Sequence, residues 1–221
     1  MPPPPGRAIV QRAMTEPDCH VDLYWLPLGA GGQCVRMSGR LYEALAALPA
    51  RRRRCDLYHS ALVVAVPEGT YAIESAPARA DGADRGVVGD GPVGSRRLGR
   101  LRLFRYELRC ARDGTIPDLA EAVDSPRRLS ADERGARRIV ALTGAAPLPV
   151  WGRDEARAGD MWNSNSYIAW LIERAGLDAA AIRPPTGGRA PGWSAGVVVA
   201  RRARPRERDP GPRVAIDTAA P

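Results

Sequence analysis

Apolar positions in the first third of the chain predict three β-strands. Residues 21–28 are mainly apolar and aromatic, and a glycine-rich stretch follows them, as expected where a strand ends. Two further apolar runs, 57–66 and 70–75, lie on either side of a short turn from Pro67 to Gly69. Two such runs around a Pro/Gly turn are typical of a β-hairpin. We therefore expect one strand followed, further along the chain, by a hairpin.

The later part of the chain adds two predicted strands. Residues 79–99 are rich in Gly, Asp and Arg, a composition that indicates a long connection. The segment after it, 101–108, is predicted to form a strand. We interpret the closing apolar run, 192–200, as one more strand.

Three segments carry helix signals. A first helix is predicted from Ser38 to about residue 50, with leucines at helical spacing along one face. A second helix opens at the capping-box pattern of residues 130–133 and is expected to end at Gly144. In the third, Asn and Ser residues at 163–166 precede a periodic apolar stripe, and Gly176 stands where a helix usually ends.

The order of these elements predicts the fold class and a single domain. Strand, helix, hairpin, strand and helices in succession favour an α+β fold, with a small antiparallel sheet packed against helices. We expect one domain over residues 18–200. The Pro-rich residues 1–17 and the basic residues 201–221 are expected to be disordered tails.

The strongly basic composition changes this picture little. The 221 residues have a formal net charge of +8, and every basic side chain is arginine, a usage typical of a GC-rich coding bias. The arginine clusters at 51–54 and 201–208 contain no aromatic residue on which a base could stack. We therefore do not expect a nucleic-acid partner.

Hydropathy and cysteine spacing exclude further classes. No stretch approaches the roughly 18 apolar residues of a transmembrane helix, and the first residues lack the apolar core of a signal peptide. We therefore expect a cytoplasmic protein without a transmembrane segment. The four cysteines include no pair at CxxC spacing, so the sequence indicates neither a zinc site nor a disulfide framework. No metal or organic cofactor is expected, and the oligomeric state is left open.

His59 is the first candidate for chemistry, because it lies within a predicted strand between Tyr58 and Ser60. A histidine held by a sheet, with a pKa close to neutrality, suits a general base. The alternative is a partly buried histidine whose ring bonds to a backbone carbonyl. The sequence leaves both interpretations open.

Ser164 and Ser166 are the candidate nucleophiles, because both lie where a helix is predicted to begin. The free N–H groups and partial positive charge of a helix start can stabilise an oxyanion. Asn163 and Asn165 flank Ser164 and would place such N–H groups beside it. The alternative is a purely structural role, since Asn and Ser are preferred N-cap residues.

Together these segments resemble a known family. Tyr58 to Val64, the return strand Tyr71 to Ser75 and the downstream segment Trp162 to Ile172 look like the circularly permuted NlpC-type papain-like fold. This group includes the lecithin retinol acyltransferase-like and PPPDE-like proteins. The segment Trp162 to Ser166 is also similar to one found in a family of bacterial proteins.

The resemblance implies a hydrolase or acyltransferase that acts on an amide, ester or thioester. Ser164 takes the position of the family's nucleophilic cysteine, so it would attack the carbonyl with His59 as its base. Glu74 on the return strand would orient the imidazole, or would be a solvated carboxylate. The oxyanion would be received by N–H groups around Asn163 and Asn165. The substrate would be a small molecule or a peptide.

The exchange of cysteine for serine leaves a second interpretation open. A hydroxyl is almost never ionised near neutral pH, so serine depends more strongly on its base than cysteine does. The same exchange is expected in a catalytically inactive member of the fold. Such a member would serve as a ligand- or protein-binding module.

Overall fold

The computed structural model describes residues 18–28, 55–78 and 86–203. The helix predicted from Ser38, the tail 1–17 and most of the tail 201–221 lie outside the described residues. The tail begins later than predicted, because Arg201 and Arg202 are the last residues of a helix.

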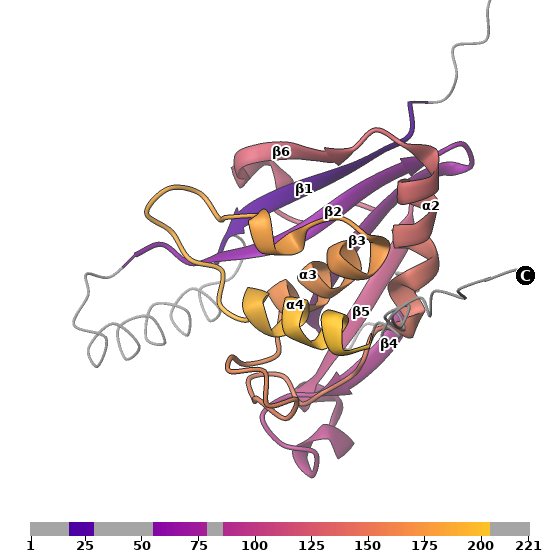
Figure 1. Ribbon diagram of the computed structural model, residues 1–221. Coiled ribbons are helices and arrows are strands. Elements are labelled where there is room, and N and C mark those ends of the chain that lie inside the picture. Colours follow the sequence, from indigo (N-terminus) through magenta and orange to yellow (C-terminus); the bar gives the residue numbers. More distant parts are fainter. Residues whose placement is uncertain (1–17, 29–54, 79–85, 204–221) are drawn as a thin grey trace, which may run out of the picture.

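A six-stranded antiparallel sheet forms the centre of the molecule (Figure 1). The strand order is β4-β5-β3-β2-β1-β6. With the helices on one of its faces, this sheet confirms the predicted α+β class. The strands are β1 His20–Pro27, β2 Tyr58–Val66, β3 Gly69–Pro77, β4 Val87–Pro92, β5 Arg105–Arg112 and β6 Val123–Ser130.

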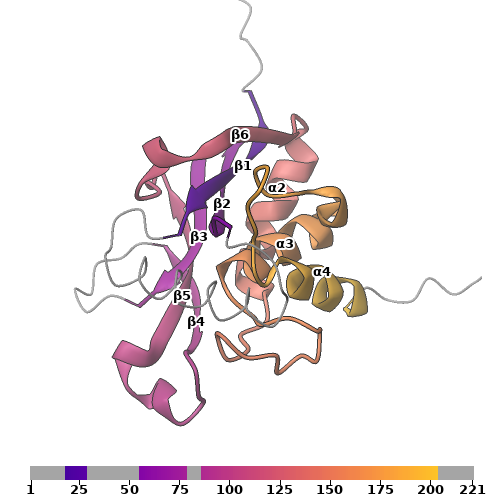
Figure 2. The same cartoon turned by 90° about the vertical axis from the view of Figure 1, so that its left-hand side faces the viewer.

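The three described α-helices cover the same face of the sheet. They are α2 Glu133–Leu142, α3 Ser164–Ala175 and α4 Trp193–Arg202. Figure 2, in which the sheet is nearly edge-on, shows all three on one side of it. The helix α3 is buried along almost its whole length and forms the main hydrophobic core with the sheet. None of the helices among the described residues has the length and apolar character to cross a membrane.

Strand alternation divides the sheet residues between two faces. On β2, Leu62 and Val64 belong to the main core and therefore point toward the helices. Ala61 points the other way and packs with Ala72 and Ile116 in a smaller apolar cluster. We call these two sides the helix face and the outer face.

The sheet forks between β2 and β3. Their ladder runs from Val66↔Gly69 only as far as Leu62↔Ile73. Beyond that point β2 continues along β1, whereas β3 continues along β5 as far as Pro77↔Tyr106. Within the described strands, the beginning of β2 and the end of β3 therefore do not pair with each other.

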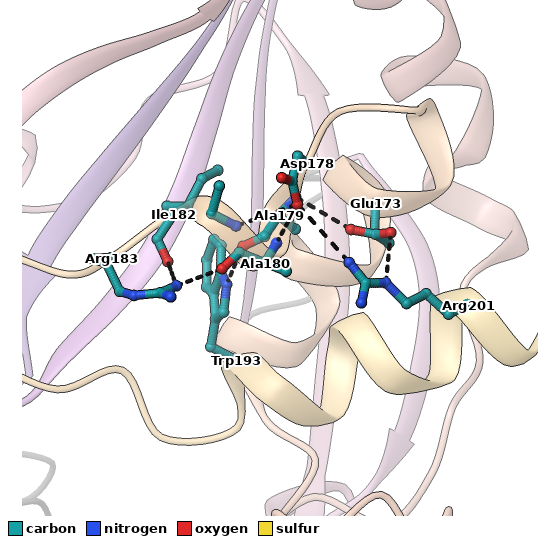
Figure 3. A network of polar contacts seen from close by, with 9 residues as sticks. Glu173, Asp178, Ala179, Ala180, Ile182, Arg183, Trp193 and Arg201 are labelled. Carbon is teal, nitrogen blue, oxygen red and sulfur yellow. Dashed lines mark hydrogen bonds and ion pairs between the residues drawn. The ribbon is translucent and has the colours of Figure 1, made fainter.

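An ion pair between a buried carboxylate and a half-exposed arginine joins α3 to α4 (Figure 3). The Glu173 carboxylate, 3% exposed as a residue, accepts a hydrogen bond from Arg201 Nε at 3.0 Å. Its other oxygen accepts from Ala179 N at 3.2 Å, in the short turn that follows α3. Trp193 Nε1 donates to the Ala179 carbonyl at 2.9 Å, so the start of α4 is attached to the same turn.

The strand predicted over 192–200 is wrong, because these residues form most of α4. The buried residues Ala195, Gly196 and Ala200 recur at helical spacing and form one side of this helix. At Gly196 a Cβ atom would overlap the Ser166 carbonyl oxygen. The close approach to α3 therefore requires the glycine and overrides the strand preference of the neighbouring valines.

The sheet also contains two strands that were not predicted. β4 lies inside the connection expected over 79–99, where Gly91 lets the Tyr106 ring pack against the backbone. β6 contains Pro126 and two arginines, which is tolerated because it is an edge strand. The strand expected at 101–108 begins later, at Arg105, after two short 3-10 turns.

Candidate functional site

The segment in which catalysis was expected forms the cap of α3. The Asn163 side chain accepts hydrogen bonds from Asn165 N at 2.9 Å and from Ser166 N at 3.4 Å. In return, Asn163 N donates to Ser166 Oγ at 3.0 Å, which completes a capping box. The Ser166 hydroxyl also donates to the Gly192 carbonyl at 2.7 Å, so its role is structural.

Asn165 attaches the start of α3 to the sheet. Its Nδ2 donates to the Tyr58 carbonyl at 3.0 Å and to the Pro191 carbonyl at 2.9 Å. Its Oδ1 accepts from Ser60 Oγ at 2.9 Å. Asn165 is 1% exposed and Ser60 is fully buried. Asn165 is therefore a structural residue whose amide is satisfied at every polar atom.

Ser164 is the first residue of α3 and is only 7% exposed. Its hydroxyl makes no hydrogen bond with the residues that the structure describes. A nucleophilic serine needs a base within about 2.6–3.2 Å of its oxygen. No such base is found among the described groups around it.

His59 lies on the outer face, away from α3. Its neighbour Ser60 points to Asn165, so strand alternation turns His59 to the opposite side. There it stands opposite Leu26, a member of the smaller apolar cluster. Burial lowers the pKa of His59 to about 4, and the carboxylate of Asp118 offsets this only in part. The imidazole is therefore neutral at physiological pH.

Glu74 is also on the outer face, but across the fork from His59. It is paired with Arg109, whose Nη1 donates to Glu74 Oε1 at 3.1 Å. The structure thus separates Ser164, His59 and Glu74. The reason is the strand register: a shift of one residue on β2 would exchange the faces of Ser60 and His59, and the hydrophobic pattern alone did not define which faces α3.

A cavity of about 610 Å³ opens over β3 and β5 on the outer face. Its size is within the range of small-molecule sites. It is lined by Ala72, Glu74, Gly86, Arg109, Cys110, Ala111, Arg112, Gly114, Thr115 and Pro117.

Buried charges form one wall of this cavity. Besides Glu74, Arg109 contacts Glu107, to which its Nη2 donates at 2.8 Å. The side chains of the three residues are 10%, 7% and 9% exposed for Glu74, Arg109 and Glu107. Glu74 Oε2 accepts no hydrogen bond from the described residues. Two carboxylates thus share the Arg109 guanidinium, and Glu107 also lies 3.6 Å from Arg102 Nη2.

Part of this wall left a signal in the sequence. Charged residues at 105, 107 and 109 alternate with Tyr106, Leu108 and Cys110, so they share one face of β5. The pairing with Glu74 had no such signal, because it depends on the register between β3 and β5.

Comparisons with known proteins found no match to a family model, to a curated protein or to a solved structure. Among the described residues, no group of three or more His, Cys, Asp or Glu side chains is arranged to hold a metal ion.

Proposed function

We propose that the protein is a binding module that takes a small polar ligand with an amino group into the outer-face cavity. The observation that carries this proposal is the buried Glu74–Arg109 pair in the cavity wall, in which Arg109 also binds Glu107. Burying a charged group costs free energy unless the group is paired. Glu74 Oε2 accepts no hydrogen bond from the described residues and lies beside the cavity, so it is suited to bind a cationic ligand.

The charges around the cavity indicate a ligand that carries both a positively and a negatively charged group. Glu74 Oε2 is free to accept from an ammonium group. Arg112 also lines the cavity; its side chain is 59% exposed, and its Nε lies 3.7 Å from the exposed carboxylate of Asp113. Its guanidinium suits a carboxylate at the other end of the ligand. Amino acids and short peptides carry these two groups.

The binding module is favoured over the Ser–His hydrolase or acyltransferase because of the position of His59. Catalysis by Ser164 needs an imidazole at hydrogen-bond distance, and His59 extends from the other face of the sheet. We also propose that the fold is a permuted papain-like fold. The order of the hairpin β2–β3 and the helix α3 along the chain supports it. A cytoplasmic location is proposed with it.

The proposal can be tested by thermal unfolding and calorimetry with defined probes. L-lysine, L-alanyl-L-alanine and putrescine would each be compared with the compound in which every amine is acetylated, so that no ammonium charge remains. We expect the amines to raise the melting temperature and the acetylated forms to have no effect. Glu74→Gln should weaken binding about ten- to a hundredfold, the range for losing a charged hydrogen bond.

Two further variants complete this experiment. Thr115→Trp places a large ring at the exposed edge of the cavity and should block binding while leaving the charged network intact. Glu133→Gln removes an exposed carboxylate on α2 and should bind like the wild type. The proposal fails if none of the amines binds, or if binding persists unchanged in Thr115→Trp.

A further inference from the structure

The connection between β4 and β5 forms a projecting tip. We call residues 93–104 the tip loop. It contains two consecutive 3-10 turns, Leu98–Arg100 and Arg102–Phe104. Figures 1 and 2 both show this segment extending beyond the sheet and the helices at one end of the molecule.

Three leucines are exposed on the tip loop. Leu98 is 44% exposed, Leu101 is 58% exposed and Leu103 is 84% exposed. They account for half of the six exposed large apolar side chains among the described residues. A concentration of exposed leucines on a convex projection marks a surface that contacts an apolar partner.

The same loop is strongly basic. It contains Arg96, Arg97, Arg100 and Arg102, and no acidic residue. Arg96 is paired with Glu155, and Arg102 lies 3.6 Å from a Glu107 oxygen. Arg97 and Arg100 are exposed and make no ion pair with the described residues. The loop therefore presents unneutralised positive charge around its leucines.

The tip loop has a defined conformation. Arg105 Nη1 donates to the Gly99 carbonyl at 2.7 Å, and Gly94 N donates to the Trp151 carbonyl at 2.9 Å. At Gly99 a Cβ atom would overlap Pro92, so this close approach needs the glycine. The leucines are thus exposed by a fixed backbone, and little ordering would be needed when they bind a surface.

We propose that the tip loop docks on an anionic lipid surface. Leu101 and Leu103 enter the boundary between headgroups and acyl chains, and Arg97 and Arg100 bind lipid phosphates. Leucines beside arginines are typical of segments that lie in a membrane interface. Leucine is under-represented in the hot spots of protein interfaces, and a projecting tip suits a broad surface. Guanidinium groups bind phosphate in a bidentate manner.

Vesicle flotation with the whole protein tests this proposal. The probes are vesicles of phosphatidylcholine alone and of phosphatidylcholine with phosphatidylglycerol. We expect binding to the anionic vesicles only, and weaker binding at high salt. The double variant Leu101→Ser/Leu103→Ser should lower the partition coefficient at least tenfold, because two apolar side chains are lost. Arg97→Gln and Arg100→Gln should each lower it about fivefold.

Matched controls separate the tip from the rest of the surface. Leu148→Ser changes another exposed leucine, which packs beside Gly89 of β4, and should bind like the wild type. Arg138→Gln removes an arginine on α2 and should have a much smaller effect than Arg100→Gln. The circular dichroism spectrum of each variant establishes that it is folded.

Two results would overturn the proposal. One is that the folded wild type does not float with anionic vesicles. The other is that the tip variants and their controls bind equally well. Binding to polyglutamate without binding to vesicles would assign the tip loop to an acidic protein partner instead.

Discussion

Ser60 and Asn165 meet between β2 and α3, where the Ser60 hydroxyl donates to Asn165 Oδ1 at 2.9 Å. The contact joins two segments separated by 105 positions in the chain. It accounts for Asn165 without chemistry, because each polar atom of the Asn165 amide bonds to the sheet or to the loop before α4.

The Ser60–Asn165 contact predicts a clear stability effect. Asn165→Ala removes the partner of the Ser60 hydroxyl and of the Tyr58 carbonyl, whereas the Pro191 carbonyl keeps its bond from Asn163 Nδ2 at 2.9 Å. The variant should lower the free energy of unfolding by about 2–4 kcal/mol. Ser60→Ala removes one bond and should cost about 1 kcal/mol. Urea unfolding of both variants and the double variant measures their coupling. Additive losses would contradict the contact.

Ser164 should not react with a fluorophosphonate probe. It is 7% exposed and lacks a neighbouring base, so its hydroxyl remains protonated. Ser164→Ala should change the free energy of unfolding by less than about 1 kcal/mol, since no hydrogen bond to the described residues is lost. Intact-mass spectrometry of probe-treated protein provides the measurement. Labelling of the wild type that disappears in Ser164→Ala would instead support the hydrolase.

His59 should make stability depend on pH. Its folded pKa of about 4 is below the ordinary value of 6.5, because burial disfavours the charged imidazole. The unfolded chain therefore takes up a proton below pH 6.5, whereas the folded chain does not until about pH 4. His59 therefore contributes fully to the free energy of unfolding above pH 6.5. This contribution decreases as the pH falls toward 4, by up to about 3 kcal/mol.

Unfolding of His59→Gln across this pH range isolates the effect. The difference in free energy of unfolding between the wild type and His59→Gln should change between pH 6.5 and pH 4, and should be constant above pH 6.5. Carboxylates that titrate in the same pH range remain in the wild type and in every variant. His20→Gln, which replaces the other histidine, serves as the control. An equal pH dependence of wild type and His59→Gln would show that the imidazole is not desolvated.

The Glu173–Arg201 pair should stabilise the packing of α4 on α3. Arg201→Ala leaves the buried Glu173 carboxylate without its guanidinium. Because the arginine is 53% exposed and the carboxylate keeps its bond from Ala179 N, we expect a loss of about 2 kcal/mol. Arg202→Ala, on the next residue, removes only exposed bonds to backbone carbonyls and should cost less than about 1 kcal/mol. Thermal unfolding compares the two. Equal losses would mean that the pair contributes nothing beyond the surface charge.

Local patterns in the sequence were sufficient for several elements. The hairpin β2–β3 follows from two apolar runs around a turn, and α2 and α3 follow from their caps and apolar stripes. These signals depend on neighbouring residues, so one chain segment contains all the information that they need.

Other features were decided only by tertiary structure. The valines before Ala200 became helical because Gly196 packs against α3, a contact that no local pattern contains. Side chains alternate along a strand, so register determines whether Ser60 or His59 faces α3. The pairing of Glu74 with Arg109 likewise arose from the alignment of β3 with β5. Sequence alone indicated residues suited to chemistry, whereas the three-dimensional packing determined which of them meet.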